Sequence, residues 1–147
     1  MKSLIIIRPH AVLRGLVGNI LQRFEQHGIQ ISGLKIHNIT GEQAKRLYEA
    51  HEGQYFYDRL IRNMTNAPSV LAVLDIDVPD PEDAVMMVRR IIGNTDPAKA
   101  EMGTIRGDFG LRIDQNIIHA SDSRKDARKE IPLFFNEDEL VDYNSNE

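Results

Sequence analysis

The sequence predicts one domain in which strands and helices alternate in the order β, α, β, α, β, α, β, α. Short aliphatic runs of strand length recur along the chain, and segments with helical spacing of apolar residues separate them. The chain has 147 residues, of which 41% are hydrophobic, and this is enough to bury one core. The alternation permits a parallel sheet. Two helix-crossover halves of similar length fit a split β-α-β arrangement as well, and periodicity does not decide between them.

The N-terminal part predicts a central strand followed by a long helix. Residues 4–7 are a continuous aliphatic run, which is typical of a strand covered on both faces. Pro9 ends this strand because proline cannot donate to a sheet ladder, so Arg8 stands at its carboxyl end, where ligands of α/β sheets often collect. Apolar residues follow helical spacing over residues 11–27, and Gly28 suits a helix end, so we predict one helix here.

The middle of the chain predicts a bulged strand, two helical segments and a third strand. Apolar residues alternate over residues 29–36, and their parity changes at Gly33, as it would across a β-bulge. The Thr-Gly-Glu-Gln sequence from Thr40 has capping-box spacing and predicts a helix start. A second helical segment includes residues 56–61, and the apolar run 70–74 predicts the third strand.

The C-terminal part predicts a helix, a last strand and a closing helix. Asp80 followed by Pro81 is a capping residue before proline at the first helical position, and Gly93 suits the end of that helix. After a loop, residues 111–118 return to strand character. The closing helix is expected to run to Pro132.

His119 stands where this last strand is expected to meet the closing helix. Ser121 or Asp122 is a suitable N-cap for the helix. Because the first N–H groups of a helix are unpaired and its N-terminus is positive, an anion such as phosphate would be favoured beside His119. An imidazole is substantially neutral at pH 7 and therefore nucleophilic, so it is a possible phosphoryl carrier. A lone histidine is nevertheless more often an ordinary polar residue in a turn.

Composition narrows the classes of function. The formal net charge is −4, so the surface as a whole does not attract nucleic acid, and any site for a polyanion must be local. The chain has no cysteine, which excludes disulfides and cysteine zinc sites and is compatible with a reducing cytoplasm. No apolar segment approaches the roughly 20 residues of a membrane span. We therefore expect a cytoplasmic protein that binds neither nucleic acid nor a membrane.

The segment around His119, residues 116–123, reads NIIHASDS. It resembles the active-site pattern of nucleoside diphosphate kinases, Asn-x-x-His-Gly or Ala-Ser-Asp, whose histidine is phosphorylated. Residues 103–109 (GTIRGDF) and 93–97 (GNTDP) resemble two further family segments, and the resemblance spans about residues 4–143. It implies an α+β, ferredoxin-like antiparallel sheet with a βαββαβ core and helices on one face, in a single domain over residues 1–147. It also implies ping-pong transfer of a γ-phosphoryl group from a nucleoside triphosphate to a nucleoside diphosphate through His119.

The resemblance also assigns roles around the phosphates. Arg89 and Arg106 match the arginines that hold the nucleotide phosphates, and Thr95 matches the threonine that shares them. Glu130 matches the glutamate that orients the reactive imidazole. Arg8 stands where the family has a lysine that stabilises charge on the transferred phosphoryl group. Without the resemblance, each arginine is best interpreted as a solvated surface charge.

The same resemblance assigns residues to the nucleoside. Asn116 matches the asparagine that contacts the ribose hydroxyl, and Tyr48 matches the tyrosine beside the reactive histidine. Phe56 and Ile113 match the apolar residues between which the base stacks, and Leu60 completes this slot. Apolar residues at such spacing fit a core role almost as well. The resemblance further implies Mg²⁺ held mainly by nucleotide phosphates, nucleoside di- and triphosphates as partners, and a homo-oligomer.

The chain departs from the family at the end of its first strand. The family usually has Lys-Pro-Asp, whereas this chain has Arg8-Pro9-His10. Arginine keeps the charge, but its planar fork does not replace a compact ammonium group at close quarters. The alternative hypothesis is therefore a catalytically weakened, nucleotide-binding relative that acts as an interaction or regulatory subunit. A third is a small ligand-sensing sheet module, for which the fold alone would suffice.

Overall fold

The structure, a computed structural model that describes residues 1–143, contains a four-stranded sheet in the order β2-β3-β1-β4. The strands are β1 (Lys2–Ile7), β2 (Gln30–His37), β3 (Ser69–Asp75) and β4 (Ile118–Ala120). Each neighbouring pair is antiparallel. This order and direction confirm the expected ferredoxin-like α+β fold, and the parallel-sheet alternative is wrong.

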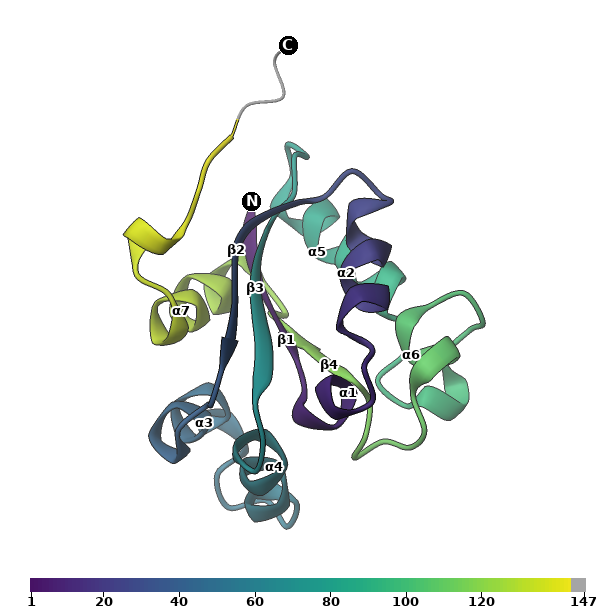
Figure 1. Ribbon diagram of the computed structural model, residues 1–147, viewed down its shortest axis with the longest axis vertical. Helices are drawn as coiled ribbons and strands as arrows, with labels where there is room; N and C mark the ends of the chain where they lie inside the picture. Colours follow the sequence, from purple (N-terminus) through teal and green to yellow (C-terminus); the bar gives the residue numbers. More distant parts are fainter. Residues whose placement is uncertain (144–147) are drawn as a thin grey trace.

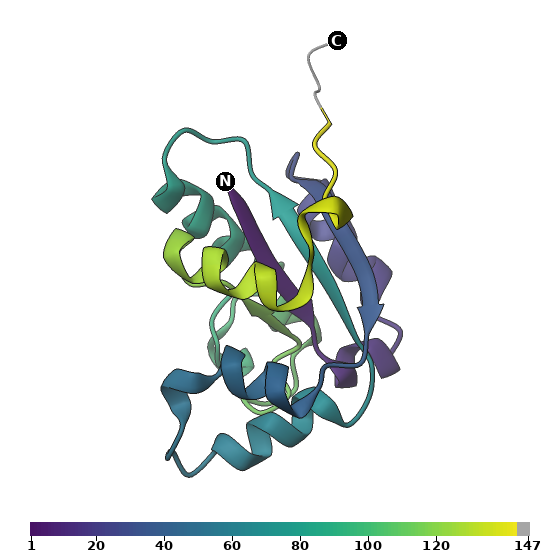
Figure 2. The same cartoon turned by 90° about the vertical axis from the view of Figure 1, so that its left-hand side faces the viewer.

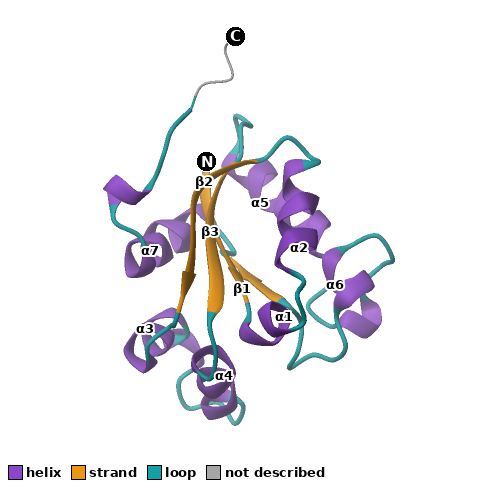
Figure 3. Cartoon of the chain, in the orientation of Figure 1, coloured by secondary structure: helices purple, strands orange, loops and turns teal. Residues whose placement is uncertain are grey.

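Helices cover both faces of the sheet (Figures 1 and 3). On one side lie α1 (Pro9–Leu13), α2 (Val17–Glu25), α5 (Pro81–Ile92) and α6 (Ile105–Phe109). On the other lie α3 (Gly41–Leu47), α4 (Tyr57–Thr65) and α7 (Arg124–Phe134). Figure 2 shows α7 lying across the strands on this second side. Three 3₁₀ turns complete the described chain at Glu49–His51, Pro97–Lys99 and Glu137–Glu139.

The alternation of side chains in β1 explains why both faces are covered. Ile5 and Ile7 enter one core together with Phe24 of α2, whereas Leu4 and Ile6 enter the opposite core. Successive residues of a strand point to opposite faces, so a continuous aliphatic run requires apolar cover on each. The expectation that helices lie over one face only is therefore corrected.

The helix predicted over residues 11–27 is divided in two. α1 ends at Leu13 and α2 begins at Val17. Gly15, between them, has φ of 73°, a left-handed conformation that interrupts a right-handed helix and that glycine adopts at little cost. Gly28 also has a positive φ, of 74°, and follows the end of α2, as the sequence indicated. Helical spacing continued across the break because both pieces face the same core.

Three local predictions are confirmed. β2 shifts register between Ile31 and Gly33, as expected for a bulge. Gly33 suits this place because a β-carbon there would lie 2.7 Å from a methyl group of Leu140. Thr40 and Gln43 form the predicted capping box of α3. Asp80 caps α5 by accepting the N–H of Glu82 at 2.9 Å, with Pro81 at the first helical position.

The strand predicted over residues 111–118 is wrong for most of its length. Most of it is loop, held by an isolated bridge between Arg112 and Gln115, and the strand β4 covers only Ile118–Ala120. Ile117 has φ of 79°, which no β-strand accommodates. His119 therefore lies inside the strand, opposite Ile6, rather than after its end.

The closing helix begins later and ends later than predicted. Its N-cap is Ser123, whose hydroxyl accepts the N–H of Asp126 at 3.0 Å. Ser121 and Asp122 do not cap it, because their side chains bond to Glu130 and Arg89 instead. The helix continues two residues past Pro132 to Phe134, whose burial in the core accounts for the extension. None of the helices within residues 1–143 is both long and apolar enough to cross a bilayer.

Candidate active site

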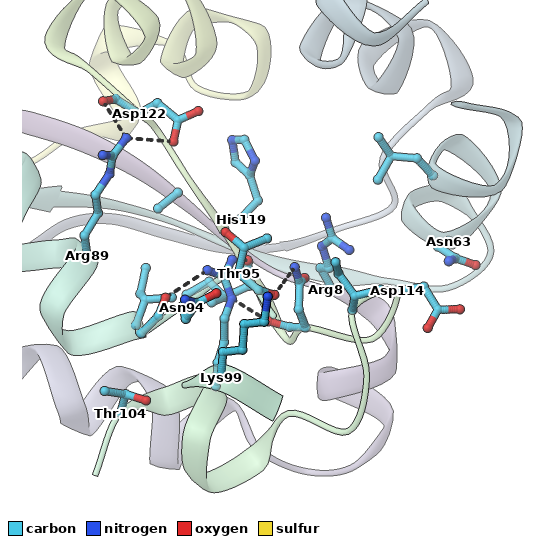
Figure 4. Close-up of a pocket in the computed structure, with 18 of the residues that line it drawn as sticks. Arg8, Asn63, Arg89, Asn94, Thr95, Lys99, Thr104, Asp114, His119 and Asp122 are labelled. Atoms are coloured by element: carbon cyan, nitrogen blue, oxygen red, sulfur yellow. Dashed lines mark hydrogen bonds and ion pairs between the residues drawn. The ribbon is translucent and has the colours of Figure 1, made fainter. Parts of the chain in front are cut away.

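A cleft of about 1220 Å³ opens beside β4. Its walls come from the ends of β1 and α3, from α4 and α5, and from the loops that precede and follow α6. All the site residues predicted from the sequence line this cleft except Glu130, which contacts His119 from α7. Figure 4 shows His119, Thr95 and Arg8 around the same cavity. The fold thus brings together residues that are more than 100 positions apart in the chain.

His119 is held by a carboxylate. Its Nε2 atom lies 2.9 Å from Oε1 of Glu130, and the hydroxyl of Ser121 donates to the same oxygen at 2.9 Å. The imidazole is partly buried, with 15% of its side chain exposed. When Nε2 carries the proton and donates to the carboxylate, Nδ1 keeps its lone pair. The predicted proximity of Glu130 to the imidazole is therefore present in the structure.

Tyr48 packs edge-on against His119. The ring centroids are 5.7 Å apart and the planes are perpendicular. Burial raises the pKa of Tyr48, and the positive charge of Arg8 opposes this rise only in part. The phenol therefore keeps its proton at neutral pH and remains a hydrogen-bond donor.

Buried polar atoms without partners gather on the wall of the cleft. Within residues 1–143, four buried side-chain atoms have no hydrogen-bond partner, and three of them are Nε of Arg8, Oη of Tyr48 and Oδ1 of Asn116. All three residues line the cleft, and only 8% of Arg8 is exposed. An unpaired buried polar atom costs free energy, so these groups are suited to a polar ligand that completes their bonds.

Arg106 is fixed by the backbone around it. Its guanidinium group donates to the carbonyl oxygens of Asn116 at 3.0 Å, Gly93 at 3.2 Å and Ile118 at 2.7 Å. Burial and the charge of Arg8 lower the pKa of Arg106 to about 10, so it is still a cation at neutral pH. Three of its five N–H groups are used in these bonds. The remaining two are free to bind an anion in the cleft.

Arg89 and Thr95 also line the cleft. Arg89 is exposed and donates to the backbone and side-chain oxygens of Asp122, at 3.3 Å each (Figure 4). The carbonyl oxygen of Thr95 accepts the side-chain amide of Asn116 at 3.3 Å. This bond ties the loop after α5 to the strand that carries His119.

The three apolar residues predicted to hold a base also line the cleft. Phe56 is the N-cap of α4, Leu60 follows one turn later, and Ile113 lies in the loop before β4. Ile113 is 62% exposed, which is unusual for an isoleucine packed as core. An exposed apolar side chain on a cleft wall fits a stacking surface better than a core role.

Further residues of the cleft were missed by sequence reasoning. They include His51, Arg59, Asn63, Arg90 and Lys99. The spacing of Asn63 from Phe56 and Leu60 puts all three on one face of a helix, which was a usable signal. The ring of His51 lies between those of Tyr48 and Phe56, at centroid distances of 6.1 and 5.4 Å. Nothing local in the sequence marked this histidine.

The charge of the cleft is opposite to that of the whole chain. Six arginine or lysine side chains line it against three carboxylates, although the formal net charge of the chain is −4. The expected contribution of a helix N-terminus is corrected, because residues 123–126 at the start of α7 do not line the cleft. Arginine side chains supply the positive field instead, which suits a ligand with several phosphates.

Comparison with known proteins shows the family of the chain. A family model described as nucleoside diphosphate kinase matches residues 1–140. The nucleoside diphosphate kinase of Thermosipho melanesiensis is 50% identical over 142 residues, which cover 97% of this chain and 93% of the relative. That of Methanocaldococcus jannaschii is 45% identical, covering 96% of this chain and 97% of the relative.

Solved structures give the same result. A halophilic nucleoside diphosphate kinase from Halobacterium salinarum in complex with CDP superposes with a TM-score of 0.91 at 36% identity, covering 99% of this chain and 94% of the other. The Aquifex aeolicus nucleoside diphosphate kinase gives a TM-score of 0.88 at 40% identity, with coverages of 95% and 98%. Family model, sequence relatives and fold agree over nearly the whole length, so the chain belongs to the nucleoside diphosphate kinase family and is a phosphotransferase of that kind.

Proposed function

We propose that the chain transfers the γ-phosphoryl group of a nucleoside triphosphate such as ATP to a nucleoside diphosphate through a phosphohistidine at His119. The observation that carries this proposal is the contact of 2.9 Å between Nε2 of His119 and Glu130 on the wall of a cationic cleft. It leaves Nδ1 as the nucleophilic nitrogen.

In the first half-reaction, Nδ1 of His119 forms a bond to the γ-phosphorus while the bond from that phosphorus to the β-phosphate oxygen breaks. The nucleoside diphosphate leaves with the electron pair of that bond. The imidazole ring gains positive charge, which the carboxylate of Glu130 stabilises through Nε2–H. In the second half-reaction, a terminal oxygen of another nucleoside diphosphate attacks the phosphorus, and the N–P bond returns its electrons to Nδ1.

The cations of the cleft compensate the negative charge of the nucleotide phosphates. Arg8, Arg89 and Arg106 line it, and their guanidinium groups are suited to phosphate oxygens. The Oη–H of Tyr48 and the unpaired Nε–H of Arg8 are further donors. Thr95 shares the phosphate contacts in this proposal. Because Arg106 is held by three carbonyl oxygens and Arg8 is buried, these two groups need little reorganisation when the phosphoryl group moves.

The nucleoside occupies the apolar part of the cleft. Phe56 and Ile113 stack on the base and Leu60 closes the slot, while the side chain of Asn116 bonds the ribose hydroxyl. The unpaired Oδ1 of Asn116 supports this assignment because a hydroxyl is a matching donor. Stacking does not read the base edge, so purines and pyrimidines both fit.

Mg²⁺ is proposed as the metal, bound mainly by phosphate oxygens. No group of three or more histidine, cysteine or acidic residues suited to a metal occurs within residues 1–143. The cleft offers single carboxylates, such as that of Asp122, and Mg²⁺ commonly takes one or two carboxylates plus substrate phosphates. When bound, Mg²⁺ neutralises charge on the triphosphate.

Assembly and location complete the proposal. The chain acts in the cytoplasm as one domain over residues 1–147, of which 144–147 lie outside the described part, and it forms a homo-oligomer. The support for assembly is the edge strand β2, where Ile36 is 75% exposed and Leu34 is also exposed. Sedimentation of wild type and Ile36→Lys tests it, because a charge on this face should dissociate the assembly. Equal sedimentation would contradict this interface.

The phosphohistidine is tested with γ-labelled triphosphate. Wild type should take up label that is acid-labile and base-stable, and should release it when a nucleoside diphosphate is added. His119→Ala should take up none. Label that persists in His119→Ala, or its absence from wild type, would remove the proposal.

An Arg8→Lys variant tests the weakened-relative alternative, which the named relatives do not support. The alternative predicts rapid phosphoryl exchange between nucleotides only in the lysine variant. Our proposal predicts that wild type itself catalyses this exchange.

A further inference from the structure

The segment Arg8-Pro9-His10 forms hydrogen bonds with both the N–H and the carbonyl oxygen of Ile117, in the loop that precedes His119. The N–H of Ile117 donates to Nε2 of His10 at 3.0 Å. The N–H of Arg8 donates to the carbonyl oxygen of Ile117 at 2.9 Å. The departure from the family pattern at His10 is therefore in direct contact with the segment that leads to His119.

Ile117 is the centre of a strained turn. Its φ is 79°, and the N–H of Ile118 donates to the carbonyl of Asn116 at 2.9 Å, two residues back. A positive φ with this hydrogen bond defines the rarer form of γ-turn. Isoleucine is β-branched and avoids positive φ, so the conformation is unfavourable and must be maintained by its surroundings.

Two sets of bonds maintain it. Arg106 donates to the carbonyls of Asn116 and Ile118, on either side of the central residue. His10 and Arg8 hold the central residue itself. Of these contacts, the bond to Nε2 of His10 is the one that satisfies the N–H of Ile117.

His10 is suited to act as an acceptor because it stays neutral. Burial lowers its pKa to about 4, with help from the charges of Arg8 and Arg14, and this value already includes the opposing effects of the Gln115 backbone and the Asp114 carboxylate. Nε2 therefore keeps its lone pair at neutral pH. If the imidazole were protonated, Nε2 would carry a hydrogen and could no longer accept the N–H of Ile117.

We propose that His10 is a positioning residue for phosphoryl transfer: by accepting the N–H of Ile117, it holds the γ-turn that sets the placement of Asn116 and His119. The inference rests on the proposed function of His119. It assigns His10 a role that does not require contact with the nucleotide, since His10 is not among the residues that line the cleft.

Two variants of nearly equal length separate positioning from packing. His10→Gln keeps an oxygen acceptor at about the reach of Nε2, whereas His10→Met keeps the length without a good acceptor. We expect His10→Met to slow phosphorylation of His119 by about 10- to 100-fold, because small misplacements of reacting groups have large effects. His10→Gln should stay within about threefold of wild type. Equal rates in the two variants, whether fast or slow, would overturn the proposal.

A second background tests whether His10 acts through the backbone of Ile117. Glycine adopts a φ of 79° without steric cost, but Ile117→Gly also removes a buried side chain, so each rate is compared with that of Ile117→Gly itself and not with wild type. In that background, His10→Met should change the rate by less than about threefold relative to Ile117→Gly itself. An undiminished effect would contradict a role through Ile117.

Amide hydrogen exchange at Ile117 separates this proposal from the proposed function. It should be slow in wild type and His10→Gln and at least about tenfold faster in His10→Met. If wild type takes up no label on His119, the proposed function fails, but the exchange result still tests the hydrogen bond between Ile117 and His10. Unchanged exchange in His10→Met would overturn the role proposed for His10, whatever the labelling shows.

Discussion

Oε1 of Glu130 accepts two hydrogen bonds of 2.9 Å, one from Nε2 of His119 and one from Oγ of Ser121. The two donors come from the middle of β4 and from the residue that follows this strand, whereas the acceptor lies two turns into α7. The carboxylate thereby fixes the rotation of the imidazole and the position of its proton. The reactivity of His119 should depend on this oxygen more than on the hydroxyl that shares it.

Glu130→Gln should slow single-turnover phosphorylation by about 100-fold, because a neutral amide stabilises the charged imidazole less and can present its NH₂ group to Nε2. Ser121→Ala is the matched control and should cost less than about threefold, since the bond between Glu130 and His119 remains. Rapid-quench measurement of acid-labile label gives both rates. Equal losses in the two variants would argue that the network acts as a whole.

Arg106 and Arg89 should respond differently to lysine. Arg106→Lys loses most of the three carbonyl bonds, so its free energy of unfolding should fall by about 2 kcal/mol or more. Arg89→Lys, at an exposed position, should change stability by less than about 0.5 kcal/mol but raise KM for the nucleotide. Urea unfolding and steady-state kinetics distinguish them. A stable Arg106→Lys protein would show that these bonds do not hold the loop.

His10 should make stability depend on pH. Its pKa falls from 6.5 to about 4 on folding, mainly through burial, so between these values the unfolded chain binds a proton that the folded chain does not. The free energy of unfolding therefore falls as pH decreases through this window and is fully regained above it. After allowance for partial solvent exposure, the change is about 1–2 kcal/mol.

His10→Gln should remove that contribution, because glutamine does not titrate. Urea unfolding of both proteins at several values between pH 6.5 and 4 measures the difference in slope. Carboxylates common to both proteins cancel in this difference. Parallel curves would refute the assignment to His10.

Two glycines should respond to alanine in opposite ways. A β-carbon on Gly107 would overlap the carbonyl oxygen of Glu101, which is backbone and cannot move aside cheaply, so Gly107→Ala should lose more than about 2 kcal/mol. Gly18, inside α2, has open space around that position, so Gly18→Ala should gain about 0.5–1 kcal/mol. Thermal melts of the two variants test the pair. If Gly107→Ala had the same stability as wild type, this would show that the loop around α6 can move aside to accommodate the β-carbon.

Local signals predicted much of the fold. The capping box at Thr40 and the Asp80-Pro81 helix start depend on neighbours within a few residues, and a local change of parity indicated the bulge at Gly33; each feature is present. The predictions failed where an unusual conformation interrupts a regular pattern. Gly15 breaks a helix whose spacing continues, and the positive φ of Ile117 ends a strand whose composition continues.

By itself, the sequence determined most of the strands and helices, that both faces of β1 need cover, and, through its motifs, which residues to expect around His119. Only the tertiary structure decided that His119 lies inside β4, that Arg106 binds three carbonyls, and that a negatively charged chain contains a cationic cleft. The periodicity of apolar residues indicates which face of one segment is buried, whereas these features arise from contacts between segments far apart in the chain. The bond from Ile117 to His10, which spans 107 positions, is of this second kind.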